Sequence, residues 1–297
     1  MGAARFLTGL IRIVKKDELS VIVNTGDDLE LFGLHISPDL DIITYTLADI
    51  VDEEKGWGIR GDTFRCLEML RKYGEDTWFC LGDRDLATHL YRTDRRKHGV
   101  PLSQITDEIC DVLRLKSKIL PMSNDRFETR ITTQEGSMHF EEYFVKRHYG
   151  DEVLGVEFVG IDSARPAPGV IDAILDAEVV VVCPSNPIVS IGTILSVAGV
   201  RDALKRTDAR VVAVSPIVAG VPLKGPADKM MRALSLEVSA YGVAKIYSDF
   251  LDAMVIDFRD LSQKDRIEQL GLSVTVTNTV MKNLAAKISL AKSVLQS

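Results

Sequence analysis

Residues 179–194, VVVVCPSNPIVSIGTI, constrain the fold more than any other stretch of this chain. A run of four valines is typical of a parallel strand that is buried on both faces of a sheet. The run ends in a polar turn, and a helix-like pattern follows from Ser190 onward. The free backbone N–H groups and the positive dipole end at the start of such a helix favour binding of an anion. Ordinary capping of the helix is the alternative that this pattern leaves open.

The rest of the chain extends this strand–helix alternation to both ends. Buried strands are predicted at 19–23, 179–183, 211–214, 253–257 and 272–275. Helices are expected at 5–14, 41–49 and 62–73, and a short strand at 77–81. The order predicts the α/β class, with a Rossmann-like, doubly wound and mainly parallel sheet. Because ligands of such sheets bind at the carboxyl ends of the strands, the residues after each strand are the candidate site.

The middle of the chain has a different pattern. A helix-rich stretch covers 86–115, with a break near 99–101, and extended segments follow it without intervening helices. These segments are residues 118–122, 128–133, 138–145 and 156–160. Their alternation predicts antiparallel strands. We therefore expect a Rossmann-like core made of 1–85 and 161–297, and a smaller inserted α/β region at 86–160.

Composition excludes several classes of protein. The chain has 297 residues, is 46% hydrophobic and carries a net charge of -7, which argues against a general nucleic-acid-binding surface. The four cysteines form no CxxC pair, so we expect neither a disulfide framework nor a zinc site, but buried thiols in a reducing compartment. No apolar run reaches membrane-spanning length, and no signal-peptide pattern is present. A cytoplasmic protein without nucleic-acid or membrane partners is expected.

Polar residues gather after the first predicted strand. Asn24, Asp27 and Asp28 follow it directly, and Asp39 and Asp41 stand at the start of the next helix. Carboxylates of this kind are the hard oxygen ligands that magnesium takes in combination with substrate phosphates. The alternative is structural, because Asp27 could close a turn and Asp39 could cap a helix.

Two further segments carry charged candidates. Asp83, Arg84 and Asp85 follow the expected short strand, and Arg84 there could hold a phosphate or a polar ring, or belong to a solvated ion-pair cluster. Lys224 lies in a Gly/Pro-rich turn that could approach a nucleotide, or be an ordinary loop. The sequence contains neither GxxxxGK[ST] nor GxSxG, which argues against a P-loop NTPase and an α/β-hydrolase.

Six separated blocks share a single resemblance. They are NTGDD (24–28), SPDLD (37–41), WGIRGDT (57–63), LGDRDLATH (81–89), PSNPIVSIGTI (184–194) and SPIVAGVPLKGPA (215–227). In this order, and over nearly the whole chain, they resemble the 2-phospho-L-lactate transferase family of coenzyme F-420 biosynthesis. The resemblance implies a Rossmann-like core with an added smaller region. It also implies transfer of a 2-phospho-L-lactyl or phosphoenolpyruvyl group from a guanosine diphosphate-linked donor to the deazaflavin alcohol Fo, with release of GMP and a requirement for Mg2+.

The resemblance assigns expected roles to the polar residues. Asp39 and Asp41 are the expected catalytic pair. The expected contacts to Fo come from Asp41, Asp83 and Arg84. Nucleotide or phosphate contacts are expected from Asn24, Ser185, Asn186, Ser190, Gly192 and Lys224. Magnesium is expected on Asp27, Asp28 and Asp39, although the sequence leaves open which aspartate binds metal and which orients the acceptor hydroxyl.

Two functions other than a transferase were weighed against the sequence. The same superfamily includes a nucleotide-sugar-binding regulatory protein, which would keep the phosphate site and lose the acceptor site. A dehydrogenase is disfavoured, because no complete GxGxxG with an acidic ribose partner is present. Family members usually begin with a strand and a GGTG-type loop just ahead of the segment matching residues 3–7, and this sequence begins at Met1 and Gly2. Small-molecule substrates and a homodimer are the expected partners.

Overall fold

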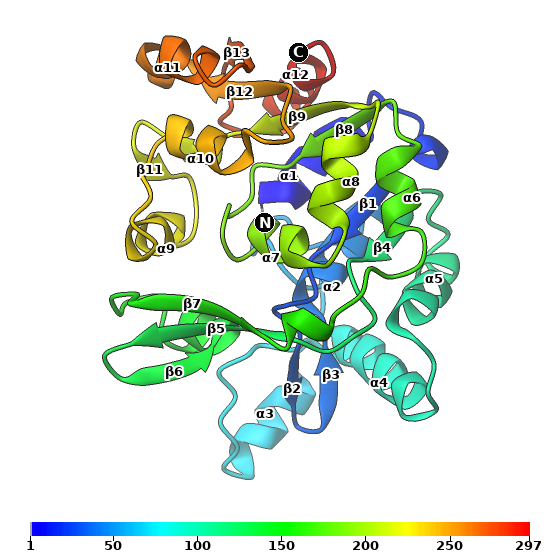
Figure 1. Ribbon diagram of the computed structural model, residues 1–297. Helices are drawn as coiled ribbons and strands as arrows, with labels where there is room; N and C mark the ends of the chain where they lie inside the picture. The colour runs from blue at the N-terminus through cyan, green and yellow to red at the C-terminus, as the bar shows by residue number, and fades with distance from the viewer. Residues whose placement is uncertain (1) are drawn as a thin grey trace.

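The structure, a computed structural model, describes residues 2–297, so Met1 lies outside the described part of the chain. Its largest sheet has the strand order β13-β12-β9-β8 with every pair parallel (Figure 1). The strands are β8 (Val179–Val182), β9 (Arg210–Val214), β12 (Ala253–Asp257) and β13 (Ser273–Thr277). All four predicted strands of the second half are therefore confirmed, within a few residues at their ends.

A second parallel pair joins β1 (Ser20–Val23) to β4 (Lys118–Pro121), with Ser20 opposite Lys118. The prediction of β1 is confirmed, but the antiparallel pairing expected for 118–122 is wrong. The physical reason is burial: Ile119 and Leu120 are 1% and 3% exposed when β4 lies beside β1 in the main core.

Helices cover both faces of these sheets, as the doubly wound prediction requires. α1 (Gly2–Leu10), α2 (Pro38–Leu47) and α12 (Leu284–Leu295) share one hydrophobic core, together with Val212 and Val214 of β9. Alternate residues of β9 face the opposite core. That second core is formed with α6 (Val170–Leu175), α7 (Ile191–Ser196), α8 (Val200–Arg206) and α10 (Ala240–Tyr247).

Three strands from the middle of the chain form an antiparallel sheet of order β6-β5-β7, which lies below the parallel strands in Figure 1. Its strands are β5 (Glu128–Thr133), β6 (Gly136–His139) and β7 (Gly155–Val159). The strand expected at 138–145 ends at His139, and a π-helix at Glu142–Lys146 follows. This change of structure buries Tyr143 completely. The division of the chain into a core and an insertion at 86–160 stays a prediction.

Helix ends depart from the expected bounds for local reasons. α2 begins at Pro38 rather than near Asp41, because proline is well suited to the first turn of a helix. α3 covers Arg65–Lys72, and Gly74 with φ 91° ends the turn after it. The helical stretch at 86–115 is confirmed as α4 (Asp83–Lys97) and α5 (Leu102–Val112). Residues 77–81 form no strand, so that prediction is wrong.

The remaining elements are short. They are β2 (Leu29–Leu31), β3 (Leu34–Ile36), β10 (Ile217–Val218), β11 (Val221–Pro222), α9 (Ala227–Ala233), α11 (Lys264–Glu268) and the 3-10 turns Lys16–Glu18, Ile161–Ser163 and Phe258–Gln263.

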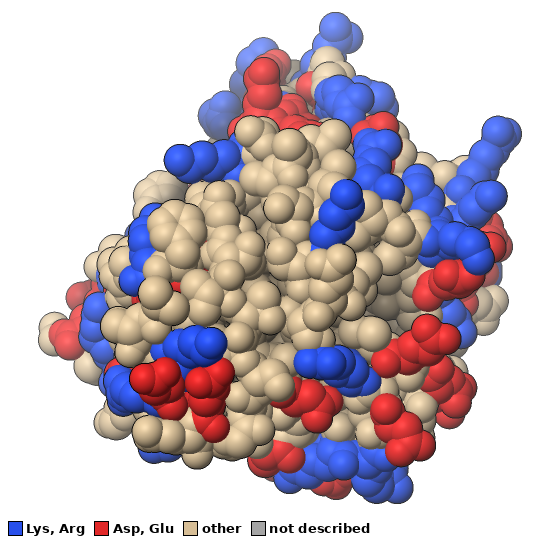
Figure 2. All heavy atoms as spheres, turned by 90° about the horizontal axis from the view of Figure 1, so that it is seen from above, with Lys and Arg blue, Asp and Glu red and all other residues tan. Residues whose placement is uncertain are grey.

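Within residues 2–297, no helix has the length and apolar character needed to cross a membrane. All four cysteines are free; Cys110 is buried as expected, whereas Cys66 and Cys80 are exposed. Charged side chains of both signs lie around the rim of the face in Figure 2, and its centre is largely uncharged.

Candidate active site

Asn24 connects three segments at the carboxyl end of β1. It is 3% exposed, and its Nδ2 atom lies 2.8 Å from Oδ2 of Asp27 and 3.0 Å from Oδ2 of Asp39. The same nitrogen lies 3.3 Å from the carbonyl oxygen of Val189, in the turn between β8 and α7. The Oδ1 atom of Asn24 accepts a bond from Gly26 N. The amide therefore holds two carboxylates together, and its expected contact with a phosphate stays a prediction.

The carboxylates around Asn24 are buried without enough cations to balance them. Burial, followed by the charges of Asp39 and Glu141, raises the pKa of Asp27 well above its usual value. Burial also raises the pKa of the half-buried Asp39, and the Asn24 hydrogen bond offsets part of that increase. Oδ1 atoms of Asp27 and Asp28 are buried and have no hydrogen-bond partner among the described residues. Such orphan oxygens are expected where a cation or a substrate donor completes the site.

Glu141 is a member of this carboxylate cluster that the sequence analysis missed. It is 7% exposed, and burial together with the Asp39 charge raises its pKa to about 8. His139 fixes its position: His139 Nδ1 accepts from Glu141 N at 3.1 Å, and Nε2 lies 3.2 Å from the carbonyl oxygen of Asp28. The acceptor role of Nδ1 requires a neutral ring, and burial lowers the pKa of His139. The inserted sheet therefore brings a fourth carboxylate to the end of β1.

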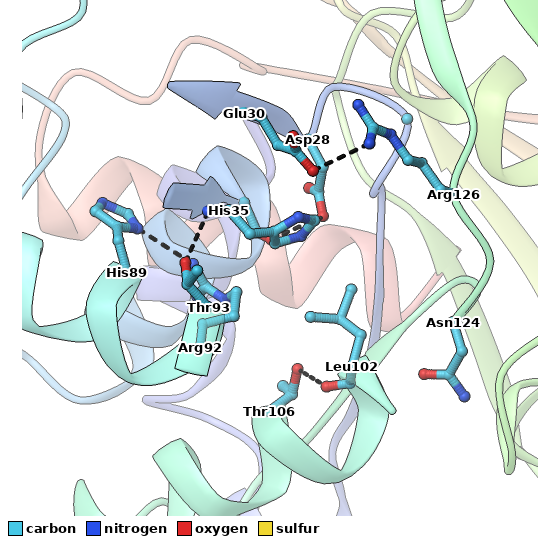
Figure 3. Close-up of polar contacts among 12 residues, drawn as sticks. Asp28, Glu30, His35, His89, Arg92, Thr93, Leu102, Thr106, Asn124 and Arg126 are labelled. Carbon is cyan, nitrogen blue, oxygen red and sulfur yellow. Dashed lines mark hydrogen bonds and ion pairs between the residues drawn. The ribbon is translucent and has the colours of Figure 1, made fainter. Parts of the chain in front are cut away.

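Asp28 is held from the β3 side. Its Oδ2 atom accepts from Ser37 Oγ at 2.7 Å and lies 3.0 Å from His35 Nε2. Figure 3 shows the His35 ring against Asp28, and the backbone nitrogen of His35 donates to Thr93 Oγ1 of α4. One oxygen of Asp28 is thus used for positioning, and the other is the orphan described above.

Asp41 does not join the cluster. Asp41 is 6% exposed. Its carboxylate forms a bidentate pair with Arg92, in which Nη1 lies 3.0 Å from Oδ2 and Nη2 contacts Oδ1. Arg92 itself is 2% exposed and projects from α4 (Figure 3). The predicted catalytic pair of Asp39 and Asp41 is therefore separated by the structure, because residues two apart on a helix project in different directions.

A buried network surrounds the Asp41–Arg92 pair. Nδ1 of His89 lies 3.7 Å from Asp41 and Nε2 lies 3.4 Å from Asp85, while Tyr45 Oη donates to Asp85 at 2.8 Å. Asp41, Asp85 and His89 come close enough together to hold a metal ion. The Arg92 guanidinium already supplies the positive charge there, so we assign this network to the packing of α2 on α4.

The turn after β8 lies beside the cluster through the contact of Asn24 with Val189. Oδ1 of Asn186 accepts from the backbone nitrogens of Ile188 and Val189 and shapes this turn. Ser190 is the N-cap residue of α7 without a side-chain capping bond, and Ser185 is half-buried nearby. A Cβ on Gly192 would lie 2.9 Å from the carbonyl oxygen of Pro187, so this glycine permits a close backbone approach. Whether Ser185, Asn186, Ser190 and Gly192 bind phosphate stays a prediction.

Asp83 and Arg84 have partners in another segment. The Asp83 carboxylate accepts from Thr63 Oγ1 and from the backbone nitrogens of Arg65 and Cys66 at the start of α3, and the Thr63 bond is the main cause that lowers its pKa. Nη2 of Arg84 donates to the carbonyl oxygen of Arg60 at 2.9 Å. Their observed contacts tie α4 to residues 60–66, and their expected contact with Fo stays a prediction.

Lys224 follows β11 and lies near a second cation. Burial lowers its pKa, and the charge of Arg5 on α1 adds to the effect. Two cations held close enough to repel one another are stabilised when an anion binds between them.

Known proteins of one family resemble this chain over nearly its whole length. Residues 1–289 match the protein family described as "2-phospho-L-lactate transferase CofD". The chain is 42% identical over 302 residues to a phosphoenolpyruvate transferase of Kitasatospora aureofaciens, covering 99% of this chain and 94% of that protein. It is 41% identical over 294 residues to a 2-phospho-L-lactate transferase of Methanosarcina acetivorans, covering 99% and 95%. A crystal structure of a UPF0052 family protein from Bacillus halodurans superposes with a TM-score of 0.64 at 16% identity, over 99% of this chain and 96% of that one, and supports the fold alone.

The family match and the named relatives identify this α/β chain, with its acidic cluster at a strand end, as an enzyme of the transferase class that acts on small molecules. The chain belongs to the CofD family of 2-phospho-L-lactate transferases. The resemblance found in the sequence is thereby confirmed, and neither of the two transferases named above supports the nucleotide-sugar-binding regulator.

Proposed function

We propose that this enzyme transfers a phospholactyl or phosphoenolpyruvyl group from a guanosine diphosphate-linked donor to the terminal hydroxyl of the deazaflavin alcohol Fo. The hydroxyl oxygen forms a bond to the phosphorus of the transferred group, the bond from that phosphorus to the GMP oxygen breaks, and GMP leaves. The single observation that carries the proposal is the buried carboxylate cluster with unpartnered oxygens at the end of β1. Membership of the family indicates which class of reaction this cluster catalyses.

In this proposal a magnesium ion takes one or two ligands from the cluster, since Asp41, Asp85 and His89 are the group of three metal-capable side chains that converges among the described residues. Asp27, Asp28 and Asp39 offer hard oxygen ligands, and Glu141 adds a fourth carboxylate that the sequence did not indicate. Burial, followed by repulsion from the neighbouring carboxylates, raises the pKa of Asp27 and Glu141, and a bound cation would relieve both effects. A bound magnesium ion would neutralise diphosphate charge and favour departure of GMP. Magnesium usually takes one or two protein carboxylates, so we expect only part of the cluster to ligate it.

The remaining carboxylates have a second task in this proposal. Transfer of a phosphoryl-type group depends mainly on positioning and on charge neutralisation, so the protein needs one group that orients the acceptor hydroxyl and takes its proton. Asp39 is the best candidate because it is half-buried and is held by Asn24, whereas Asp41 is committed to Arg92. Asp41 acts in this proposal as a positioning residue that fixes α2.

The donor diphosphate would lie between the turn after β8 and the Arg5–Lys224 pair. The turn contacts the cluster through Asn24, and the pair provides positive charge next to α1. This placement leaves the acceptor to approach from the side of the inserted sheet, which supplies Glu141.

The direct test is an assay with Fo, Mg2+ and each guanosine donor separately, in which GMP and product mass are followed. The identities of 42% and 41% to relatives named for different transferred groups do not favour either donor, so both are required. Formation of GMP only when Fo is present supports the proposal. Binding of a guanosine donor without any transfer to Fo would contradict it.

Two finer expectations belong to the same proposal. A reducing cytoplasm fits the free, exposed thiols of Cys66 and Cys80. We also propose a homodimer, which light scattering of the purified protein measures directly.

A further inference from the structure

β13 forms an outer edge of the main parallel sheet. Its one neighbouring strand among residues 2–297 is β12, and β13 lies at the top of Figure 1. All of β12 is buried, whereas Ser273 is exposed and residues 274–277 are half-buried. Both faces of β13 are covered: α11 packs on one, and on the other Ser293 Oγ of α12 lies 3.5 Å from Thr277 Oγ1. The exposure of β13 therefore comes from its free edge.

This edge has none of the sequence features that normally prevent a sheet edge from pairing. Residues 272–277, LSVTVT, contain no charged residue and no proline. Other edge strands of the protein have such features, because β7 carries the exposed Glu157, and β4 carries the exposed Lys118 and ends in Pro121. Figure 2 looks down on the top of Figure 1, where β13 lies, and the centre of that face is largely uncharged. An edge of this kind is a template for a strand from another chain.

The backbone direction of β13 identifies the groups at the free edge. The amide of Ser273 donates to the carbonyl oxygen of Asp252, just before β12, so Ser273 turns its backbone groups toward β12. Backbone groups of successive residues in a strand point to opposite sides. Those of Val274 and Val276 consequently point away from β12. Each offers one N–H and one C=O group to a further strand.

Exposed apolar side chains lie on the elements beside this edge. Phe258 and Leu261, in the turn that contacts β13, are 56% and 58% exposed. Leu284 and Leu295, at the two ends of α12, are 44% and 38% exposed. Exposed apolar side chains need no explanation when they are single, whereas groups of them mark interaction sites. The elements on both faces of β13 thus add apolar surface to the same end of the sheet.

The order of residues in β13 indicates which chain it pairs with. In either direction from Thr275, the next residue is valine, and the one after it has a hydroxyl group. A strand with this symmetry matches itself when it is turned end to end, with valine opposite valine and hydroxyl opposite hydroxyl. A twofold interface needs that self-complementarity, because the same surface patch lies on both sides of the axis.

We propose that the edge of β13 binds β13 of a second copy of this chain, as an antiparallel pair in which Thr275 lies opposite Thr275 of the other copy. The proposal rests on the homodimer proposed above and names its interface. Val274 of each chain exchanges two backbone hydrogen bonds with Val276 of the other, which satisfies the free groups of both strands. Threonine pairs across antiparallel strands are favourable. The pairing joins two four-stranded sheets into one continuous sheet.

Disulfide trapping tests the register directly. In this pairing the two Thr275 residues form a non-hydrogen-bonded pair, with Cα atoms about 4.5 Å apart. That distance lies in the range of about 4.4–6.8 Å that a disulfide requires. Thr275→Cys should therefore give a disulfide-linked dimer under mild oxidation. The exposed Cys66 and Cys80 are replaced by serine in every chain used, and the chain with these two changes alone gives the background.

Ser273→Cys is the matched control. Ser273 lies opposite Thr277 of the other copy in the proposed register, so the two Ser273 residues are separated by four residues, roughly 13 Å along the strand. A disulfide cannot span that distance. Ser273 is exposed and Thr275 is half-buried, so random collision would favour the control. We expect at least about tenfold more linked dimer from Thr275→Cys than from Ser273→Cys.

A charge pair at the same position provides a second measurement. Thr275→Lys and Thr275→Glu each place like charges opposite one another, so light scattering should show a monomer for either variant alone. An equimolar mixture should recover the dimer, because unlike charges then face one another across the axis. The melting temperature of each variant reports whether the fold is kept.

The outcomes separate this interface from the rest of the proposed function. A monomeric unmodified protein would contradict the homodimer and the interface together. A dimer with equal trapping at both positions, or with none at Thr275→Cys, would overturn the β13 interface and leave the homodimer in place. Failure of the mixed variants to associate, although both keep the fold, would also overturn it. No readout involves Fo or a donor, so transfer activity is tested separately.

Discussion

The side-chain amide of Asn24 lies 3.0 Å from the carboxylate of Asp39, although the two residues belong to a strand end and a helix start. The same amide also holds Asp27. A neutral donor between the buried Asp27 and the half-buried Asp39 lets the two carboxylates approach without an intervening protein cation. The consequence is a site that is electrostatically strained in the absence of metal.

Replacing Asn24 with aspartate should show this strain. Asn24→Asp removes the donor and adds a negative charge, so we expect a loss of about 2–3 kcal/mol in the free energy of unfolding in metal-free buffer. Millimolar Mg2+ should recover part of that loss. Urea unfolding with and without Mg2+ measures both quantities, and Asn278→Asp in an exposed loop is the matched control. Equal stability of the two variants would contradict the arrangement.

Asp39 and Asp41 should respond differently to the same substitution. Asp39→Asn should lower turnover by at least about a hundredfold, the low end for loss of a positioned acid–base group. Its stability should not fall, because burial already disfavours the charge of Asp39. Asp41→Asn should instead cost about 3–5 kcal/mol of stability, since it leaves the buried Arg92 charge uncompensated. Steady-state turnover and urea unfolding of both variants separate these outcomes. A stable Asp41→Asn protein without turnover would return Asp41 to the catalytic group.

Metal-free stability should depend on pH through Glu141. Its pKa is raised from 4.5 to about 8 in the folded protein, so the folded state holds this proton more tightly than the unfolded chain does. The resulting contribution to stability is fully present below about pH 4.5 and is lost as the pH rises toward 8. At about 1.4 kcal/mol per pKa unit, the upper limit is of the order of 5 kcal/mol.

Urea unfolding from pH 5 to pH 8 measures this slope, and Glu141→Gln should flatten it. Glu142→Gln, at the start of the adjacent π-helix, is the matched control and should keep the slope. Saturating Mg2+ should also flatten the slope of the unmodified protein, because a cation favours the ionised carboxylates. A flat metal-free profile would remove Glu141 from the cluster.

Lys224 should matter for the donor and not for Fo. Lys224→Met keeps much of the aliphatic stem and removes the charge beside Arg5, so the donor KM should rise about tenfold or more while the KM for Fo changes little. Lys282→Met on an exposed segment is the control. Equal changes in both KM values would place Lys224 outside the donor site.

The strand pattern of the parallel sheets could be read from the sequence because buried parallel strands are continuous apolar runs, as in residues 179–182 and 253–256. The pairing of β4 could not, because short strands in the middle of the chain carry no signal for their partner. The grouping of Asp27 with Asp39 could be predicted from their places at a strand end and a helix start.

The separation of Asp39 from Asp41 and the presence of Glu141 differ in whether the sequence could have indicated them. The separation of Asp39 from Asp41 was available from helical geometry, because successive residues turn by about 100° and positions two apart do not share a face. Glu141 had no such signal. Its segment reads as an alternating strand, and only tertiary packing of the π-helix brings its carboxylate to β1.

The two ring nitrogens of His139 bond the backbone of Asp28 and the backbone of Glu141. This ring therefore fixes the spacing between the antiparallel sheet and the acidic cluster. Residues 134–135 form the turn between β5 and β6, so loop-length variation there leaves the strand register intact. One residue added between His139 and Glu141 would instead move the carboxylate by a full backbone step. Length changes across this insertion should be tolerated at its tip and rejected at its base, although both positions lie outside the parallel sheets.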